Sequence, residues 1–182
     1  MTILNTTASQ LVIIDIQERL APAIANEAAA LKATLLLVAA AQRLNVPISV
    51  TEQYPKGLGV TVAPLRAALG AHAAIFEKMH FSAMREVEFG RHLAQAQRKT
   101  LVICGMEAHV CVLQTALDAK AAGYDVALVA DAVGSRVEQS REIALQRAAQ
   151  AGLTLVTAEM VVFEWLQRAG TDDFKAIAPL LK

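Results

Sequence analysis

Short apolar runs alternate along the chain with longer, Ala-rich segments. The runs are nearly continuous in apolar residues, which is typical of parallel strands that are covered on both faces and therefore show no polar alternation. Strands that alternate with helices predict an α/β fold, in which helices pack on both faces of one sheet. The pattern therefore predicts a three-layer α/β/α domain with a six-stranded parallel sheet, whose strands lie at residues 11–16, 47–51, 73–77, 100–104, 125–130 and 153–157.

Helices are predicted from the segments between these runs. Pro22 is expected to open the first, which extends to about Leu44, because proline is favoured in the first turn of a helix. The second spans 109–122 and stops before Gly123, and the third spans 138–150. Apolar residues recur at helical spacing in 159–169, where Trp165 fits the core or a subunit interface better than a substrate contact. Proline and glycines in 53–60 predict a turn-rich loop.

The composition narrows the class of protein. The chain has 182 residues, which fits one domain spanning 1–182, and 55% of them are hydrophobic. Its 17 Lys and Arg balance its 17 Asp and Glu, so no basic surface for a nucleic acid is expected. Only 19% of the residues are charged, so few charged side chains are available to cover the surface of the protein. We therefore expect part of that surface to be buried in a homo-oligomer.

The chain has two cysteines, Cys104 and Cys111. Two are too few for a disulfide framework and lack the further ligands of a zinc site, so a reducing, cytoplasmic environment is expected. The polar N-terminus and the short apolar runs predict neither a leader nor a contact with a membrane. The expected partner is therefore a small-molecule substrate.

Polar residues follow several of the predicted strands. Open α/β sheets bind ligands outside the carboxyl ends of their strands, so these positions are candidate ligand contacts. Five places qualify, namely Asp15, the loop 52–59, Lys78, the turn 105–111 and Asp131.

Three of these places carry side chains that could take part in catalysis, and each of these side chains also has an ordinary structural explanation. Asp15 ends an apolar strand, where an aspartate often caps the next helix. Lys78 ends another strand, where a solvent-facing charge is common. Cys111 falls near the first turn of a helix, whose N–H groups favour a thiolate, although a buried core role is equally open. Cys104 lies within a strand and is expected to be a small buried residue.

The three side chains are better candidates for catalysis as a group than singly, because adjacent parallel strands end on the same edge of a sheet and could bring them close together. An ammonium such as that of Lys78 lowers the pKa of a nearby thiol, and a carboxylate such as that of Asp15 can accept the thiol proton. The residues alone therefore suggest nucleophilic catalysis by Cys111.

Five segments carry a more specific resemblance. Residues 11–17 (LVIIDIQ), 76–83 (FEKMHFSA) and 104–112 (CGMEAHVCV) resemble, in order, the three motif blocks of the isochorismatase-like cysteine hydrolases. Segments 54–59 and 129–135 are similar to the branch of small isochorismatase-domain proteins. The resemblance spans almost the whole chain and implies an isochorismatase-like, Rossmann-like fold.

The resemblance also implies a catalytic triad of Asp15, Lys78 and Cys111. In such an enzyme Cys111 attacks an amide-type carbonyl and forms a thioester, Asp15 takes the thiol proton and later activates water, and Lys78 holds the pair. A cis peptide bond between Met106 and Glu107 is implied as well. The backbone N–H groups of Glu107 and Cys111 would then form the oxyanion hole.

Differences from the family pattern bear on the substrate. Nicotinamidases carry an Asp-x-His and a further His after the second strand to hold a metal, whereas residues 52–59 contain no histidine. Neither a metal nor a cofactor is therefore expected, and the four histidines, at 72, 80, 92 and 109, are scattered. Members that cleave isochorismate lack the nucleophilic cysteine, so Cys111 argues against that activity.

Candidate pocket residues lie near the motifs, and they are Gln17, Leu20, Tyr54, Phe81 and His109. Core packing or loop anchoring explains the first four at least as well as substrate contact. His109 is the one histidine close to the proposed nucleophile in the sequence.

The leading hypothesis is a metal-independent cysteine hydrolase that cleaves a small amide or related C–N bond through a thioester on Cys111. The alternative is a non-catalytic scaffold or binding protein with the same fold. Peroxide sensing, with Cys104 as the resolving thiol, is disfavoured because Cys104 is expected inside a strand. The substrate itself depends on loop side chains that the sequence does not place.

Overall fold

The computed structural model describes residues 3–181 and contains one six-stranded sheet. All neighbouring strands are parallel, in the order β3-β2-β1-β4-β5-β6, so the predicted sheet is confirmed. The strands are β1 (Ser9–Ile14), β2 (Ile48–Gln53), β3 (Ala73–Lys78), β4 (Thr100–Met106), β5 (Asp125–Gly134) and β6 (Thr154–Val156).

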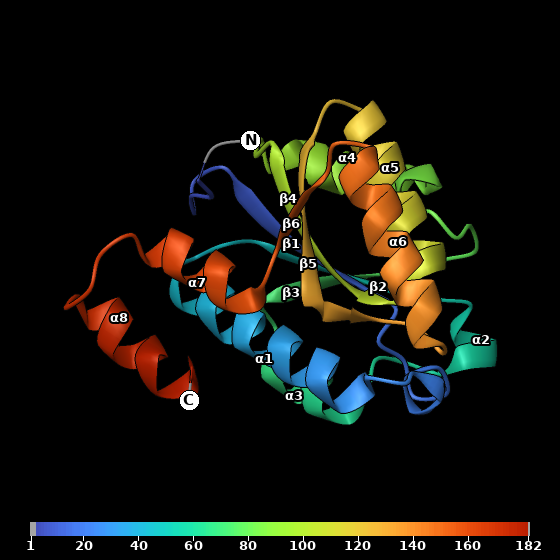
Figure 1. Ribbon diagram of the computed structural model, residues 1–182, viewed down its shortest axis with the longest axis horizontal. Coiled ribbons are helices and arrows are strands. Elements are labelled where there is room, and N and C mark those ends of the chain that lie inside the picture. The colour runs from blue at the N-terminus through green and yellow to red at the C-terminus, as the bar shows by residue number, and fades with distance from the viewer. Residues whose placement is uncertain (1–2, 182) are drawn as a thin grey trace.

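Helices cover both faces of this sheet, as Figure 1 shows. One apolar core lies between the sheet and α1 (Glu27–Arg43), α3 (Ala63–Leu69), α7 (Ala158–Leu166) and α8 (Asp172–Ile177). A second core lies on the opposite face, under α4 (Val87–Gln95), α5 (Leu113–Ala121) and α6 (Glu138–Gln150). The shorter elements are η1 (Ala21–Ala23), α2 (Pro55–Leu58), η2 (Ala83–Arg85), η3 (Ala108–Val112) and η4 (Ala178–Leu181). No helix within residues 3–181 is both long and apolar enough to cross a membrane.

The position of each strand in the sheet explains its composition. Every residue of β1 and β2 is buried, since neighbours flank both strands and helices cover both faces. β3 is an edge strand, and its Ile75 and Glu77 are exposed. Lys78, its last residue, is nevertheless buried, because its side chain points back over the sheet toward the neighbouring strands. The edge strand thus delivers one buried charge to the carboxyl end of the sheet.

The strand order reverses between β1 and β4, which are neighbours at the centre of the sheet. From β1 the chain first builds β2 and β3 on one side, and then β4, β5 and β6 on the other. Such a switch point leaves room above the strand ends, because the connections leave in opposite directions. The segments that follow β1 and β4 therefore lie side by side at the edge where ligands bind in this class of sheet.

The start of the first helix differs from the prediction. Pro22 lies in the short turn η1, and α1 begins five residues later, at Glu27. Between them Ile24 is extended, and the backbone N–H of Ala25 donates to the carbonyl of Ser135 at the end of β5. A tertiary contact with the sheet therefore outweighs the preference of proline for a first helical turn.

Several other boundaries also differ from the prediction. β4 and β5 continue to Met106 and Gly134, beyond the predicted ends, because the ladder resumes after an irregularity between Ile103 and Gly105. The segment predicted as one helix over 109–122 begins as the π-helical turn η3 before α5. The predicted loop 53–60 contains the short helix α2, whereas 138–150 is helical as predicted.

Gly105 lies against the backbone of Ile14 on the neighbouring central strand. Its φ is +122°, and a Cβ added there would lie 2.0 Å from the carbonyl oxygen of Ile14. Both the conformation and the contact with backbone exclude a side chain.

Gly105→Ala is therefore expected to destabilise the fold by about 3 kcal/mol or more, as measured by urea unfolding. The control is Gly90→Ala in α4, where a Cβ meets nothing within 4 Å, and which should be neutral or stabilise by up to about 1 kcal/mol. Equal midpoints for Gly105→Ala and the wild type would contradict the close approach.

Candidate active site

Three segments of the chain bring the predicted catalytic side chains to the carboxyl edge of the sheet. Asp15 directly follows β1 with a φ of 51°, a left-handed conformation that aspartate tolerates better than most residues. Lys78 is the last residue of β3, and Cys111 lies in the turn η3 that follows β4. All three side chains are buried, and the charges of Asp15 and Lys78 both act on the pKa of Cys111.

The centre of the site is an ion pair between Lys78 and Asp15. Lys78 Nζ lies 2.7 Å from Asp15 Oδ2, and the two side chains are 1% and 0% exposed. Thr51 Oγ1 donates a hydrogen bond of 2.7 Å to the other oxygen, Asp15 Oδ1. A buried pair of charges is stable only when its remaining hydrogen-bonding groups are satisfied, so these contacts are part of the same interaction.

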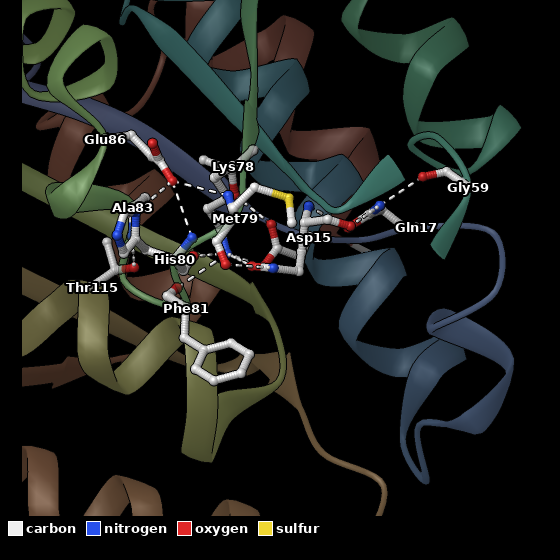
Figure 2. A network of polar contacts seen from close by, with 12 residues as sticks. Asp15, Gln17, Gly59, Lys78, Met79, His80, Phe81, Ala83, Glu86 and Thr115 are labelled. Carbon is white, nitrogen blue, oxygen red and sulfur yellow. Dashed lines mark hydrogen bonds and ion pairs between the residues drawn. The ribbon is translucent and has the colours of Figure 1, made fainter. Parts of the chain in front are cut away.

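The Lys78 ammonium has further acceptors around it, shown in Figure 2. Gln53 Oε1 accepts at 2.7 Å, and the backbone carbonyls of Phe81 and His80 accept at 3.1 and 3.3 Å. With Asp15 Oδ2, four oxygens surround three N–H groups. The ammonium is held in one position by neighbours from β2 and from the turn after β3.

Burial dominates the chemistry of the Cys111 thiol. Removal from water raises its pKa to about 12, and the negative charge of Asp15 raises it as well, whereas Lys78 lowers it. Lys78 acts in the expected direction, because it lowers the thiol pKa, but desolvation and the charge of Asp15 outweigh it.

The pKa of Asp15 is also raised above its ordinary value, mainly by burial, while Lys78 and the hydrogen bonds from Lys78 and Thr51 lower it. Among the described residues, Asp15 Oδ2 has its ion pair with Lys78 but no donor in good hydrogen-bond geometry. Within this described part of the chain, Oδ2 is thus the oxygen without a hydrogen-bond donor, since Thr51 Oγ1 binds the other one.

The peptide bond between Met106 and Glu107 is cis, as the resemblance implied. Glu107 is buried at the start of η3, and its carboxylate accepts a hydrogen bond of 2.8 Å from Arg136 Nε. This ion pair joins the turn before Cys111 to the segment that follows β5. The assignment of the Glu107 and Cys111 backbone N–H groups to an oxyanion hole stays a prediction.

Two of the five candidate pocket residues have other roles in the structure. Gln17 is fully buried, donates to the carbonyls of Gln53 and Gly59, and accepts from the Gln53 N–H. Its amide thus anchors the loop after β2, the role weighed against substrate contact in the sequence. Leu20 is partly buried and packs against the core beside α1.

The other three candidates lie on exposed or half-buried segments. Tyr54 and Phe81 are 47% and 54% exposed, and the Phe81 carbonyl is the one that binds Lys78. In Figure 2 the Phe81 ring points away from Asp15. His109 is half-buried, with its Nδ1 at 3.0 Å from the buried Ser135 Oγ. A pocket role for these three residues stays a prediction.

Sequence reasoning missed Thr51 and Gln53, which contact the ion pair from β2. A signal was present, because the otherwise apolar strand ends in Thr51-Glu52-Gln53, and these polar residues are all buried. The remaining strand-end candidate, Asp131, accepts a hydrogen bond from the Ala158 N–H at the start of α7. It therefore acts as a helix cap.

The prediction that Cys104 is a small buried residue agrees with the structure. Cys104 is fully buried within β4, and burial raises its pKa to about 12. Within residues 3–181, no three side chains of His, Cys, Asp or Glu come together as a metal site.

The all-parallel six-stranded sheet, covered by helices on both faces, defines an α/β fold of the kind that binds ligands at the carboxyl ends of its strands. The Isochorismatase domain matches residues 9–160. The secreted isochorismatase effector Isc1 of Phytophthora sojae is 43% identical over 153 residues, which cover 82% of this chain and 72% of that protein. The chain belongs to the isochorismatase family and is a hydrolase of that family.

Solved structures agree with this assignment. MAR1 ribonuclease from Caenorhabditis elegans superposes with a TM-score of 0.93 and 36% identity, over 99% of this chain and 92% of that one. The YcaC protein of Escherichia coli, an octameric hydrolase of unknown specificity, superposes with a TM-score of 0.92 and 27% identity, over 100% and 90% of the chains. The effector relative is secreted, so the cytoplasmic location stays a prediction.

Substitutions that remove one charge of the pair should change the reactivity of Cys111 in opposite directions. Asp15→Asn removes a charge that raises the thiol pKa, so alkylation by iodoacetamide at pH 8 should accelerate. Lys78→Met removes a charge that lowers it, so alkylation should slow. A change of roughly tenfold in rate is expected for each pKa unit, measured by mass spectrometry of the Cys111 peptide.

Thermal melting must accompany the rates, because breaking a buried ion pair costs about 3–5 kcal/mol. If both folded variants alter the alkylation rate in the same direction, the electrostatic account of this site is wrong.

Proposed function

We propose that the chain is a cysteine hydrolase that cleaves a small amide or related C–N bond through a thioester on Cys111, without a metal. One observation supports the proposal: the buried Asp15 carboxylate is paired with Lys78, and the charges of both act on the Cys111 thiol. A base, a nucleophile and a group that fixes the base are the parts that covalent hydrolysis requires. The absence of histidine from 52–59 supports the metal-free assignment.

In the first step the Cys111 sulfur attacks the carbonyl carbon while its proton passes to Asp15 Oδ2. The carbonyl oxygen becomes an oxyanion, to which the N–H groups of Glu107 and Cys111 are the assigned donors. Collapse of this intermediate breaks the C–N bond. The proton on Asp15 moves to the leaving nitrogen, which departs as ammonia or an amine and leaves a thioester.

In the second step water attacks the thioester carbonyl and gives up a proton to Asp15. The C–S bond breaks, the proton returns from Asp15 to the Cys111 sulfur, and a carboxylic acid is released. The enzyme regains its starting protonation state, with a neutral thiol and the Asp15–Lys78 ion pair.

The high pKa of Cys111 is compatible with this sequence. A thiol that keeps its proton until substrate arrives requires a base within contact, because the proton must leave as sulfur attacks. Asp15 supplies that base, and its raised pKa brings its affinity for protons closer to that of the thiol.

RNA is a second substrate class to examine, because one structural neighbour is described as a ribonuclease. The balanced charge of this chain, with 17 basic and 17 acidic residues, offers no general attraction for a polyanion. A single-stranded RNA oligonucleotide therefore belongs in the substrate panel as a comparison with the small amides.

Cys111→Ala is expected to abolish hydrolysis. Ammonia release from a panel of small primary amides should fall by roughly 10⁴-fold or more, because the covalent route is lost. The matched control is Cys104→Ala, which removes the other thiol from the core of β4 and should leave the rate of the folded protein unchanged.

Two outcomes would overturn this function. Turnover that survives Cys111→Ala would exclude the thioester mechanism. A wild-type protein that hydrolyses none of the amides, while binding a partner or ligand, would favour the non-catalytic alternative.

We also propose that the chain forms a homo-oligomer. The octamer of the YcaC neighbour and the exposed apolar side chains of this chain support it, among them Ile75, Met79 and Val87 near the sheet edge. Size-exclusion chromatography with light scattering should give a multiple of 19.4 kDa. A mass of one chain across micromolar concentrations would contradict the proposal.

A further inference from the structure

The Lys78 ammonium has no N–H group left for a substrate. It carries three donors, and four oxygens lie within 2.7 to 3.3 Å of its nitrogen. One of these acceptors, Asp15, is charged, and three are neutral. With its side chain 1% exposed, Lys78 cannot exchange these partners for water. Its position is therefore determined by the neutral acceptors as much as by the ion pair.

Gln53 is the strongest of the neutral acceptors, at 2.7 Å. It is paired with Lys78 in the β2–β3 ladder, so the two side chains leave the sheet on the same face. The other end of its amide, Nε2, donates to the carbonyl of Met79 at 3.0 Å. An ammonium cannot accept and a carbonyl cannot donate, so only one orientation of the amide satisfies both contacts.

Gln53 thereby holds the Lys78 ammonium and also the turn whose carbonyls bind that ammonium. Its oxygen binds Lys78 directly, while its nitrogen holds the turn that begins at Met79. The carbonyls of His80 and Phe81, the other two neutral acceptors, belong to that turn. One side chain from β2 thus connects the ammonium on the edge strand to the turn that encloses it.

We propose that Gln53 is a positioning residue of the hydrolase, which holds Lys78 against Asp15 and fixes the 79–81 turn around it. Lys78 then acts on the reaction through Asp15 and donates no hydrogen bond to the substrate. This inference rests on the proposed function, because it assigns Gln53 to the same site. This role also means that donors other than Lys78 bind the oxyanion.

The first test is Gln53→Met, which keeps the length of the side chain but removes both polar ends. Lys78 loses an acceptor and moves relative to Asp15, so kcat should fall about 10- to 100-fold, as expected for a small displacement of a catalytic group. KM should stay within about threefold, because the displaced group does not contact the substrate. The control is Gln10→Met.

Gln10 is a matched control because it is also a buried glutamine whose Nε2 binds backbone carbonyls, those of Leu93 and Arg98. It lies near the start of β1, at the opposite end of the sheet from Asp15. Gln10→Met should lower the melting temperature and leave kcat and the alkylation rate unchanged. The comparison separates loss of stability from loss of positioning.

Alkylation of Cys111 is a second readout that needs no substrate. Among the described residues, the titratable side chains that act on the pKa of Cys111 are Asp15 and Lys78. A displaced Lys78 lowers the thiol pKa less, so Gln53→Met should slow alkylation at pH 8. Gln53→Glu keeps an acceptor for Lys78 but adds a negative charge, so it should slow alkylation and move the acid limb of the kcat profile to higher pH.

The outcomes are separable. If folded Gln53→Met matches the wild type within about twofold in kcat, KM and alkylation rate, Gln53 is not a positioning residue. If Gln53→Met does not fold, Gln53→Glu decides the question. The inference is overturned if the alkylation rate and the acid limb of the kcat profile of Gln53→Glu both match those of the wild type. If the wild type hydrolyses no amide, the proposed function fails, while the alkylation rates still decide whether Gln53 positions Lys78.

Discussion

The buried ion pair between Asp15 and Lys78 is the interaction on which the rest of the site depends. Both side chains are excluded from water, so the cost of desolvation must be offset by contacts within the protein. Thr51 and Gln53 provide these contacts from β2, together with carbonyls of the turn after β3. The position of β2 between β1 and β3 makes this possible, since its residues reach the carboxylate on one side and the ammonium on the other.

The same burial determines the state of the nucleophile. A site open to water would let Lys78 dominate and would favour a thiolate, whereas the closed site raises the pKa of Cys111 to about 12. Burial thus raises the pKa of both Cys111 and Asp15 and disfavours an uncompensated third charge in the core. In the proposed reaction the proton passes to Asp15 at the moment of attack, which ties the chemistry to the geometry of the pair.

Much of the fold and part of the site could be predicted from the sequence. Apolar runs specify parallel strands wherever both faces are covered, and the motif blocks identify Asp15, Lys78 and Cys111 as partners. The start of α1 after Pro22 could not be predicted, because the intervening segment is extended by a hydrogen bond between Ala25 and a residue about 110 positions away. The net direction of the thiol pKa shift could not be predicted, because desolvation depends on packing, which no local motif reports.

Gln53 shows why the supporting residues of a site are harder to predict than its reactive ones. The polar residues that end β2 are visible in the sequence, but the role of Gln53 arises only when the ladder pairs it with Lys78. That pairing is needed because Lys78 lies on the edge strand and Asp15 follows a strand two positions away. The lysine must extend across β2 to reach its partner, and a polar side chain on β2 is what a charged group crossing a buried strand requires. The strand order therefore demands a residue such as Gln53 as directly as the chemistry demands Asp15.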